Sequence, residues 1–178
     1  MKRTALSLLL VLCTAGFALA QSASPSGYAG EVVRELNETE GKLVSLAEAF
    51  PENTWDWRPG EGVRSVRETF GHIVDGNFLI PSFMGAPGPE GYQFGQSENA
   101  GLGKSEMIQA LRDSFTHLRE AVTATAGGDM IREVSWFGGS TNTPRGIMLF
   151  IPKHLGEHQG QLIAYARMNN ITPPWSAE

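Results

Sequence analysis

The sequence predicts an all-α fold, a bundle of four helices. Four stretches carry apolar residues at three- and four-residue spacing, which is the periodicity of an amphipathic helix. No stretch shows the alternation of apolar and polar residues that predicts a strand. Because each helix must bury its apolar side against another element, four such helices joined by irregular connections favour a bundle.

Capping residues set the expected starts of two helices. Ser65 and Glu68 have the spacing of a capping box, so the second helix should begin at Ser65. Thr143 is a suitable N-cap, and Pro144 fits the first position of the fourth helix. The four expected helices lie near residues 28–50, 65–82, 105–125 and 144–168.

Two irregular connections bear on function. Residues 51–63, PENTWDWRPGEGV, contain Trp55 and Trp57, which either line the mouth of a pocket or pack over one end of the bundle. Residues 85–103 form a long connection dense in Gly and Pro, and loops of that length are usually functional or mobile.

The N-terminus has the features of a secretory signal peptide. Lys2 and Arg3 precede an apolar run, residues 6–16, that is too short to span a bilayer. Small residues then allow cleavage after Ala20. We therefore expect a secreted or periplasmic protein without stable membrane insertion after cleavage. Its expected segments are a signal peptide at 1–20, a flexible leader at 21–27 and the bundle domain at 28–178.

Charge and cysteine content exclude several classes of protein. The expected signal holds two of the 14 Lys and Arg and none of the 19 Asp and Glu, so the mature chain has a formal charge of −7. A chain this acidic is not expected to bind nucleic acid through a basic face. The single cysteine, Cys13, lies in the signal, so a mature metal site would use His, Asp, Glu or water. The expected partner is a small-molecule substrate, and a homodimer is compatible with the sequence.

Two histidines stand one helical turn apart in KHLGEHQGQLIAYAR, residues 153–167. On a helix, His154 and His158 are about 40° apart, on the side that also carries the apolar residues. Such a pair can place two imidazole nitrogens about 2.0–2.1 Å from one divalent ion. The alternative is a pair of hydrogen-bonded core residues. The metalloprotease pattern His-Glu-x-x-His is absent, since Leu155 follows the first histidine.

A third ligand would have to be His72 or His117. His117 lies off the apolar stripe of the third helix and is interpreted as a solvated surface residue. His72 lies in the middle of the second helix, beside Phe70 and Ile73. If the second and fourth helices pack together, His72 can complete a set of three histidines, which leaves coordination positions open for water.

Polar residues near the histidines are candidates for supporting roles. Asp75 and Glu157 each lie about 60° from a proposed ligand on the same helix, so each is either a catalytic base or a solvated carboxylate. Gln161 shares the ligand face and can hydrogen-bond a ligand or a bound water. Tyr165 is expected to be a core residue with its hydroxyl at the edge of the core.

Two segments together resemble the DinB-like superfamily. They are WRPGEGVRSVRETFGHIVD, residues 57–75, and HLGEHQGQLIAYARMNNITPP, residues 154–174. Members have a histidine on a helix after a Pro-containing loop, and later His-x-x-x-His followed by Gly-Gln, here Gly160 and Gln161. The resemblance covers most of the chain after the signal.

The resemblance implies a fold, a site and a range of activities. The fold is a four-helix bundle with a long crossover between helices 2 and 3. The site is a three-histidine metal site, which maps onto His72, His154 and His158 and commonly holds Zn or Ni. Activities described in the superfamily include thiol S-transferases, a thiol-dependent isomerase and metal-dependent hydrolases.

Two features depart from that pattern. Pro152 lies inside the fourth helix, where we expect it to remove a backbone hydrogen bond and kink the helix. The predicted export argues against thiol transfer, because thiol cosubstrates are cytoplasmic. A metal-dependent hydrolase of a small molecule is therefore the first hypothesis, and a noncatalytic metal-binding or interaction module is the alternative.

Overall fold

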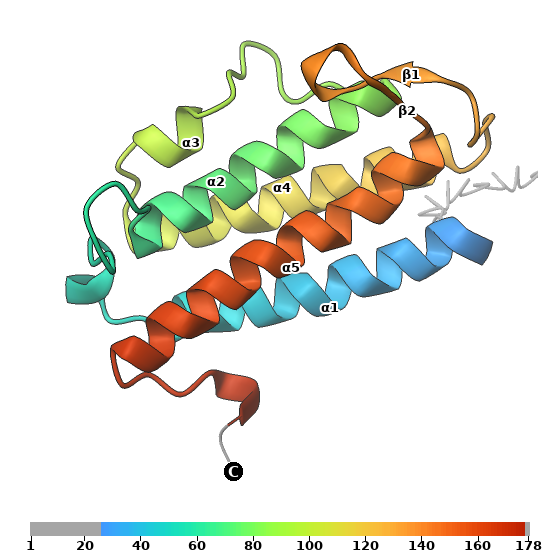
Figure 1. Ribbon diagram of the computed structural model, residues 1–178. Coiled ribbons are helices and arrows are strands. Elements are labelled where there is room, and N and C mark those ends of the chain that lie inside the picture. The colour runs from blue at the N-terminus through green and yellow to red at the C-terminus, as the bar shows by residue number, and fades with distance from the viewer. Residues whose placement is uncertain (1–25, 177–178) are drawn as a thin grey trace, which may run out of the picture.

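The computed structural model describes residues 26–176 and has the predicted all-α fold (Figure 1). Four long helices form the bundle. They are α1 (Gly27–Ala49), α2 (Val66–Leu79), α4 (Lys104–Thr125) and α5 (Pro144–Met168). The predicted signal peptide, and all but the end of the predicted leader, lie outside the described residues.

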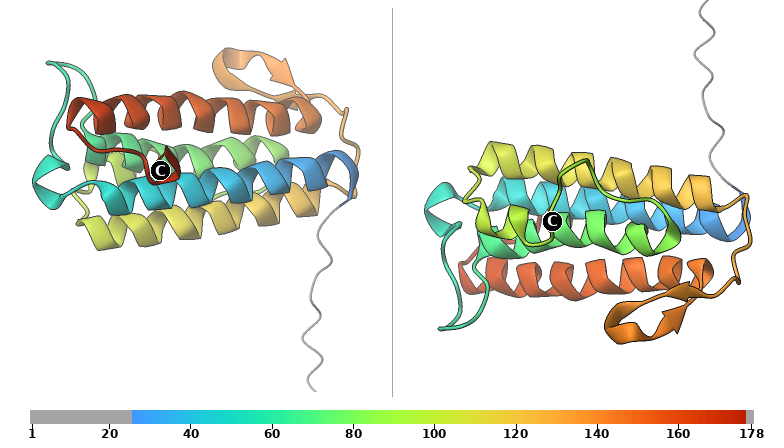
Figure 2. Two further views of the ribbon diagram at one scale, coloured as in Figure 1. Left: turned by 90° about the horizontal axis from the view of Figure 1, so that it is seen from below. Right: turned by 90° about the horizontal axis from the view of Figure 1, so that it is seen from above.

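The four helices do not simply alternate in direction. Lys104, at the start of α4, donates to the backbone of Phe50 just after α1, so α1 and α4 are antiparallel. Tyr165, near the end of α5, donates to the carbonyl of Arg64 just before α2, so α2 and α5 are antiparallel too. The neighbours α2 and α4 therefore run in the same direction, which requires a long crossover between them (Figures 1 and 2).

The expected caps are present at both predicted starts. The Ser65 hydroxyl accepts from the backbone of Glu68, whose carboxylate accepts from the Ser65 N–H, so the capping box is formed. The Thr143 hydroxyl accepts from the backbone of Gly146. The α5 helix continues without interruption through Pro152. The second helix ends at Leu79, earlier than expected, and continues as a 3-10 segment, η2 (Ile80–Met84).

The crossover between α2 and α4 folds back over α2 (Figure 2). It contains a four-residue helix, α3 (Gln96–Asn99), which the sequence did not predict. The two strands of a small antiparallel hairpin, β1 (Val134–Ser135) and β2 (Thr141–Asn142), were also not expected. Between them lies a 3-10 segment, η3 (Phe137–Gly139). This hairpin precedes α5 and lies beside its N-terminal half (Figure 1).

Two short 3-10 segments remain, and both lie toward the end of the bundle where α1 and α5 finish (Figure 1). A 3-10 segment, η1 (Glu52–Thr54), leads into the two tryptophans, and η4 (Pro174–Ser176) follows α5. Trp55 is buried and stacks on Phe70 with ring centroids 5.5 Å apart, while Trp57 meets Tyr165 edge-on. Both tryptophans therefore pack over the end of the bundle. Among residues 26–176, no helix is long and apolar enough to cross a membrane.

Candidate metal centre

Three histidines converge between α2 and α5. His72 comes from α2, and His154 and His158 come from consecutive turns of α5. One ring nitrogen from each lies within 4.8 Å of the others. The ring centroids are 5.5 Å apart for His72 and His154, 4.7 Å for His72 and His158, and 4.6 Å for His154 and His158. The antiparallel packing of α2 against α5 thus brings together residues that are more than 80 positions apart.

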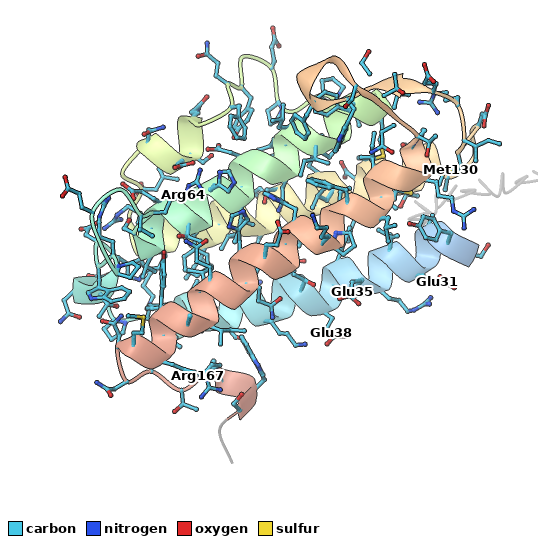
Figure 3. All side chains as sticks on the ribbon, viewed as in Figure 1. Glu31, Glu35, Glu38, Arg64, Met130 and Arg167 are labelled. Atoms are coloured by element: carbon cyan, nitrogen blue, oxygen red, sulfur yellow. The ribbon has the colours of Figure 1, made fainter. Side chains whose placement is uncertain are left out.

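His72 is held by a carboxylate from the crossover. Its Nδ1 lies 3.1 Å from Oε2 of Glu98, a residue of α3. The other carboxylate oxygen of Glu98 accepts from Nε of Arg64 at 2.7 Å. Figure 3 labels Arg64 where the chain enters α2, beside α3. Because an ionised carboxylate can only accept, Nδ1 of His72 must carry the proton, which leaves its Nε2 lone pair free.

His158 is held by a second polar chain, which comes from α5 itself. Its Nδ1 lies 3.1 Å from Oε1 of Gln161. The amide nitrogen of Gln161 donates to the Tyr165 hydroxyl at 2.7 Å, and that hydroxyl donates to the Arg64 carbonyl at 3.0 Å. Gln161 therefore accepts from Nδ1 of His158 and leaves Nε2 free, as Glu98 does for His72. Tyr165 is buried with its hydroxyl at the edge of the core.

His154 is held by packing rather than by hydrogen bonds. Its ring stacks on Phe150, with an interplanar angle of 13° and centroids 5.9 Å apart. Its Nε2 lies so close to α2 that a Cβ added at Gly76 would be 2.6 Å away. Glycine at position 76 therefore makes room for this ring. The same Nε2 is buried and has no hydrogen-bond partner among the described residues.

The surroundings keep two of the histidines neutral near pH 7. Burial, followed by electrostatic repulsion from Arg64 and His158, lowers the pKa of His72, although Glu98 acts in the opposite direction. Burial, followed by electrostatic repulsion from His158 and His72, lowers the pKa of His154 to about 4. A histidine must be neutral to bind a metal ion, so these shifts favour metal binding.

The hydrogen bonds of Asp75 give it a structural role. Its carboxylate is fully buried and accepts from the backbone nitrogens of Ser97 and Glu98, at 2.9 and 3.0 Å, and from the Tyr92 hydroxyl. It therefore caps the N-terminus of α3 from the neighbouring helix. The alternative of a solvated carboxylate was wrong for Asp75, because the crossover covers it.

Glu157 lies on the outside of α5. It is 55% exposed and pairs with Lys153 at 3.3 Å. Within residues 26–176, no hydrogen bond or ion pair joins either Asp75 or Glu157 to a histidine of the triad. A base role for either carboxylate stays a prediction.

The interpretation of His117 as a solvated residue was wrong. Its ring packs against Phe78, with centroids 5.4 Å apart, and its Nε2 is buried without a hydrogen-bond partner in the described part of the chain. Burial lowers its pKa. It is not part of the group of converging ligand atoms.

Sequence reasoning missed Glu98 and the docking of α3. A Cβ at Gly71 would lie 2.6 Å from the Cα of Glu98, so glycine at that position lets α3 rest directly on α2. One signal was available: a metal-binding histidine usually donates its second N–H to a carboxylate or carbonyl, and the long crossover after His72 contains only two acidic residues, Glu90 and Glu98.

These features fit a divalent metal ion. Three imidazoles converge, two with their Nδ1 atoms already hydrogen-bonded and one with a buried nitrogen that lacks a partner among the described residues. A ligand set of imidazole nitrogen atoms without sulfur suits Zn, Cu, Fe or Ni. The fold and the site together define a helical-bundle protein whose three histidines could hold a metal ion.

The chain belongs to the DinB superfamily, whose family model matches residues 35–162. The matched region includes all three histidines of the triad. No curated protein sequence matches this chain.

Three solved structures share the fold. A DinB-like protein from Bacillus cereus has a TM-score of 0.69 at 15% identity, over 80% of this chain and 93% of its own. A putative member of the DinB family from Exiguobacterium sibiricum has a TM-score of 0.65 at 19% identity, over 86% and 96%. A DinB-like protein from Bacillus subtilis has a TM-score of 0.60 at 20% identity, over 80% and 93%. At these identities the likeness establishes the fold and not an activity.

Proposed function

We propose that this protein is a metal-dependent hydrolase of a small molecule, and that it acts outside the cytoplasm. The observation that carries the proposal is the convergence of His72, His154 and His158 between α2 and α5. Three histidine ligands leave a coordination position open, as in catalytic rather than structural metal sites. Zn and Ni are the ions we propose, and export is proposed from the features of residues 1–20.

The residues of the site have separate tasks in this proposal. A bound ion would act as a Lewis acid on the substrate oxygen that it contacts. Glu98 and Gln161 keep the Nδ1 protons of His72 and His158 in place, so that both rings present Nε2. Phe150 fixes the plane of the His154 ring.

Hydrolysis also needs a group that takes a proton from water. We propose Glu157 for this task, because Asp75 already accepts three hydrogen bonds. Glu157 lies between the two ligands of α5 in sequence and would have to leave Lys153 to act.

A noncatalytic metal-binding or interaction module is the second candidate. The observation that favours it is the position of Glu157, which is exposed and paired with Lys153 rather than hydrogen-bonded at the triad. In this case the ion would stabilise the packing of α2 on α5 and no hydrolysis would occur.

One experiment separates the two functions. A panel of small esters and amides is incubated with the metal-loaded protein, the chelator-treated protein and the His154→Ala variant. We expect hydrolysis by the loaded protein alone, and a Glu157→Gln variant that retains the ion but loses activity. An ion-loaded protein that hydrolyses nothing in the panel would favour the noncatalytic module.

A further inference from the structure

A cavity of about 340 Å³ adjoins two histidines of the triad. Its volume is in the range of small-molecule sites, about 300–1,000 Å³. A larger cavity of about 540 Å³ lies along the crossover, but no triad histidine lines it. The smaller cavity is therefore the one that could hold a substrate at the triad. Six of the residues that line it are His72, His154, Gly76, Phe94, Phe137 and Phe150.

The wall of the cavity beside the histidines is aromatic. Phe150 stacks on His154 and meets Trp136 edge-on, at a centroid distance of 5.2 Å. The ring centroids of Trp136 and Phe137 are 4.5 Å apart, and both rings pack on Phe83. The hairpin, η2 and α5 thus build one continuous aromatic cluster that ends at the triad.

The cavity is apolar apart from the two imidazoles. None of the described residues that line it is Lys, Arg, Asp or Glu. It reaches the surface at Phe94 and Phe137, which are 53% and 42% exposed. Small-molecule sites are lined mainly by apolar and aromatic side chains with a few polar groups, as this cavity is.

We propose that this cavity holds the apolar part of the substrate, a single aromatic ring or a short branched aliphatic group. This part is joined directly to an oxygen-bearing head group that reaches the triad. The inference rests on the proposed function, because the triad supplies the site for the head group. Sugars, phosphates and charged thiols are excluded as occupants of the cavity, since their polar groups would lose hydration without gaining partners.

Two hydroxamic acids test the class of substrate. Acetohydroxamic acid and benzohydroxamic acid share a metal-binding head and differ in the group attached to it. Isothermal titration calorimetry with the metal-loaded protein should give tighter binding for the aromatic compound, by about tenfold or more, because its ring leaves water for the cavity. Equal affinities would overturn the proposal while leaving the metal site intact.

Phe137 provides the matched variant. Phe137→Ala removes a half-exposed part of the wall without touching the triad, and should reduce the preference for benzohydroxamic acid by about threefold or more. Ile131→Ala serves as control, because Ile131 is 73% exposed and does not line the cavity. An unchanged preference in Phe137→Ala would count against this wall as the binding surface.

Toluene tests the cavity without a metal ion. In the chelator-treated protein it should shift the methyl NMR signals of Leu79 and Ile80, which line the cavity, and leave those of Ile131 unchanged. If these signals stay fixed, the cavity does not bind apolar groups and the inference fails. If toluene shifts the signals of Leu79 and Ile80 but the purified protein retains no ion, the inference about the cavity holds and the proposed enzymatic function fails.

Discussion

The four histidines of the chain occupy two different regions of the bundle. Three lie between α2 and α5, and the fourth, His117, lies on α4 against Phe78. Both regions contain a buried imidazole nitrogen without a hydrogen-bond partner in the described residues, on His154 and on His117. Burial lowers the pKa in both places.

The two regions differ in whether several histidine nitrogens converge on one point. At the triad, one ring nitrogen from each histidine lies within 4.8 Å of the other two, and two of the rings are fixed by polar partners. His117 has an aromatic ring beside it and belongs to no such group. A buried, neutral imidazole is therefore not a metal site by itself. Several imidazoles must converge on one point, and polar partners on their other nitrogens help to orient them.

The largest expected effect is on metal retention. His72→Ala, His154→Ala and His158→Ala should each lose the ion on dialysis, because each removes one of the three proposed ligands. His117→Ala should retain it. Elemental analysis measures the ion, and circular dichroism checks that each variant is folded. If a folded His72→Ala variant retained the ion, α2 would contribute no ligand to the site.

Glu98 tests whether the polar partners of the triad matter. Glu98→Ala leaves Nδ1 of His72 without its acceptor, and should weaken metal binding by about 10- to 100-fold. Glu90→Ala is the control, because Glu90 is exposed in the same crossover. Affinities are measured by competition with a chromogenic chelator. The same affinity in both variants would show that Glu98 does not orient His72.

Gly76 tests the packing on the other side of the triad. A Cβ at position 76 would lie 2.6 Å from Nε2 of His154, so Gly76→Ala must displace that ring. We expect a loss of about 1–3 kcal/mol in the free energy of unfolding, measured by urea denaturation.

Gly156 is the matched control on the exposed side of α5, where nothing would meet a new Cβ. Gly156→Ala should raise the free energy of unfolding by up to about 1 kcal/mol, because alanine loses less backbone entropy in a helix. Equal effects of the two substitutions would mean that the His154 ring tolerates displacement.

The smallest expected effect concerns His117 and pH. Because its pKa is lowered in the folded protein, the unfolded chain binds the proton more readily below pH 6.5. Its contribution to stability is thus complete above pH 6.5 and is lost as pH falls. The metal-free His117→Gln variant should lose less stability than the metal-free wild type between pH 7.5 and 5.5. Parallel losses in urea denaturation would mean that His117 protonates freely in the folded state.

The helices were predictable because their signals are local. Apolar periodicity located all four. The N-cap of α2 at Ser65 and the start of α5 at Pro144 follow from side chains within three residues. The helix α3 was not predictable in this way. It is four residues long and is held by the Asp75 carboxylate and the space at Gly71, both on another helix. The two-residue strands are likewise too short for periodicity to reveal.

The candidate site was predictable in part for the same reason. Spacing on one helix pairs His154 with His158, and the resemblance to the superfamily adds His72. The position of Glu98 depends on how the crossover folds back, which no local pattern encodes. The burial of His117 was not predicted. The helical angle places His117 beside the apolar stripe of α4, but it does not reveal that Phe78 packs against the ring.

The most direct test of the metal centre is a crystal structure of the protein as purified, with anomalous diffraction data collected at the absorption edge of the metal found by elemental analysis. The predicted result is one anomalous peak about 2.0–2.1 Å from one nitrogen each of His72, His154 and His158. An anomalous peak at another position, or none in a protein purified without chelators, would contradict the metal centre.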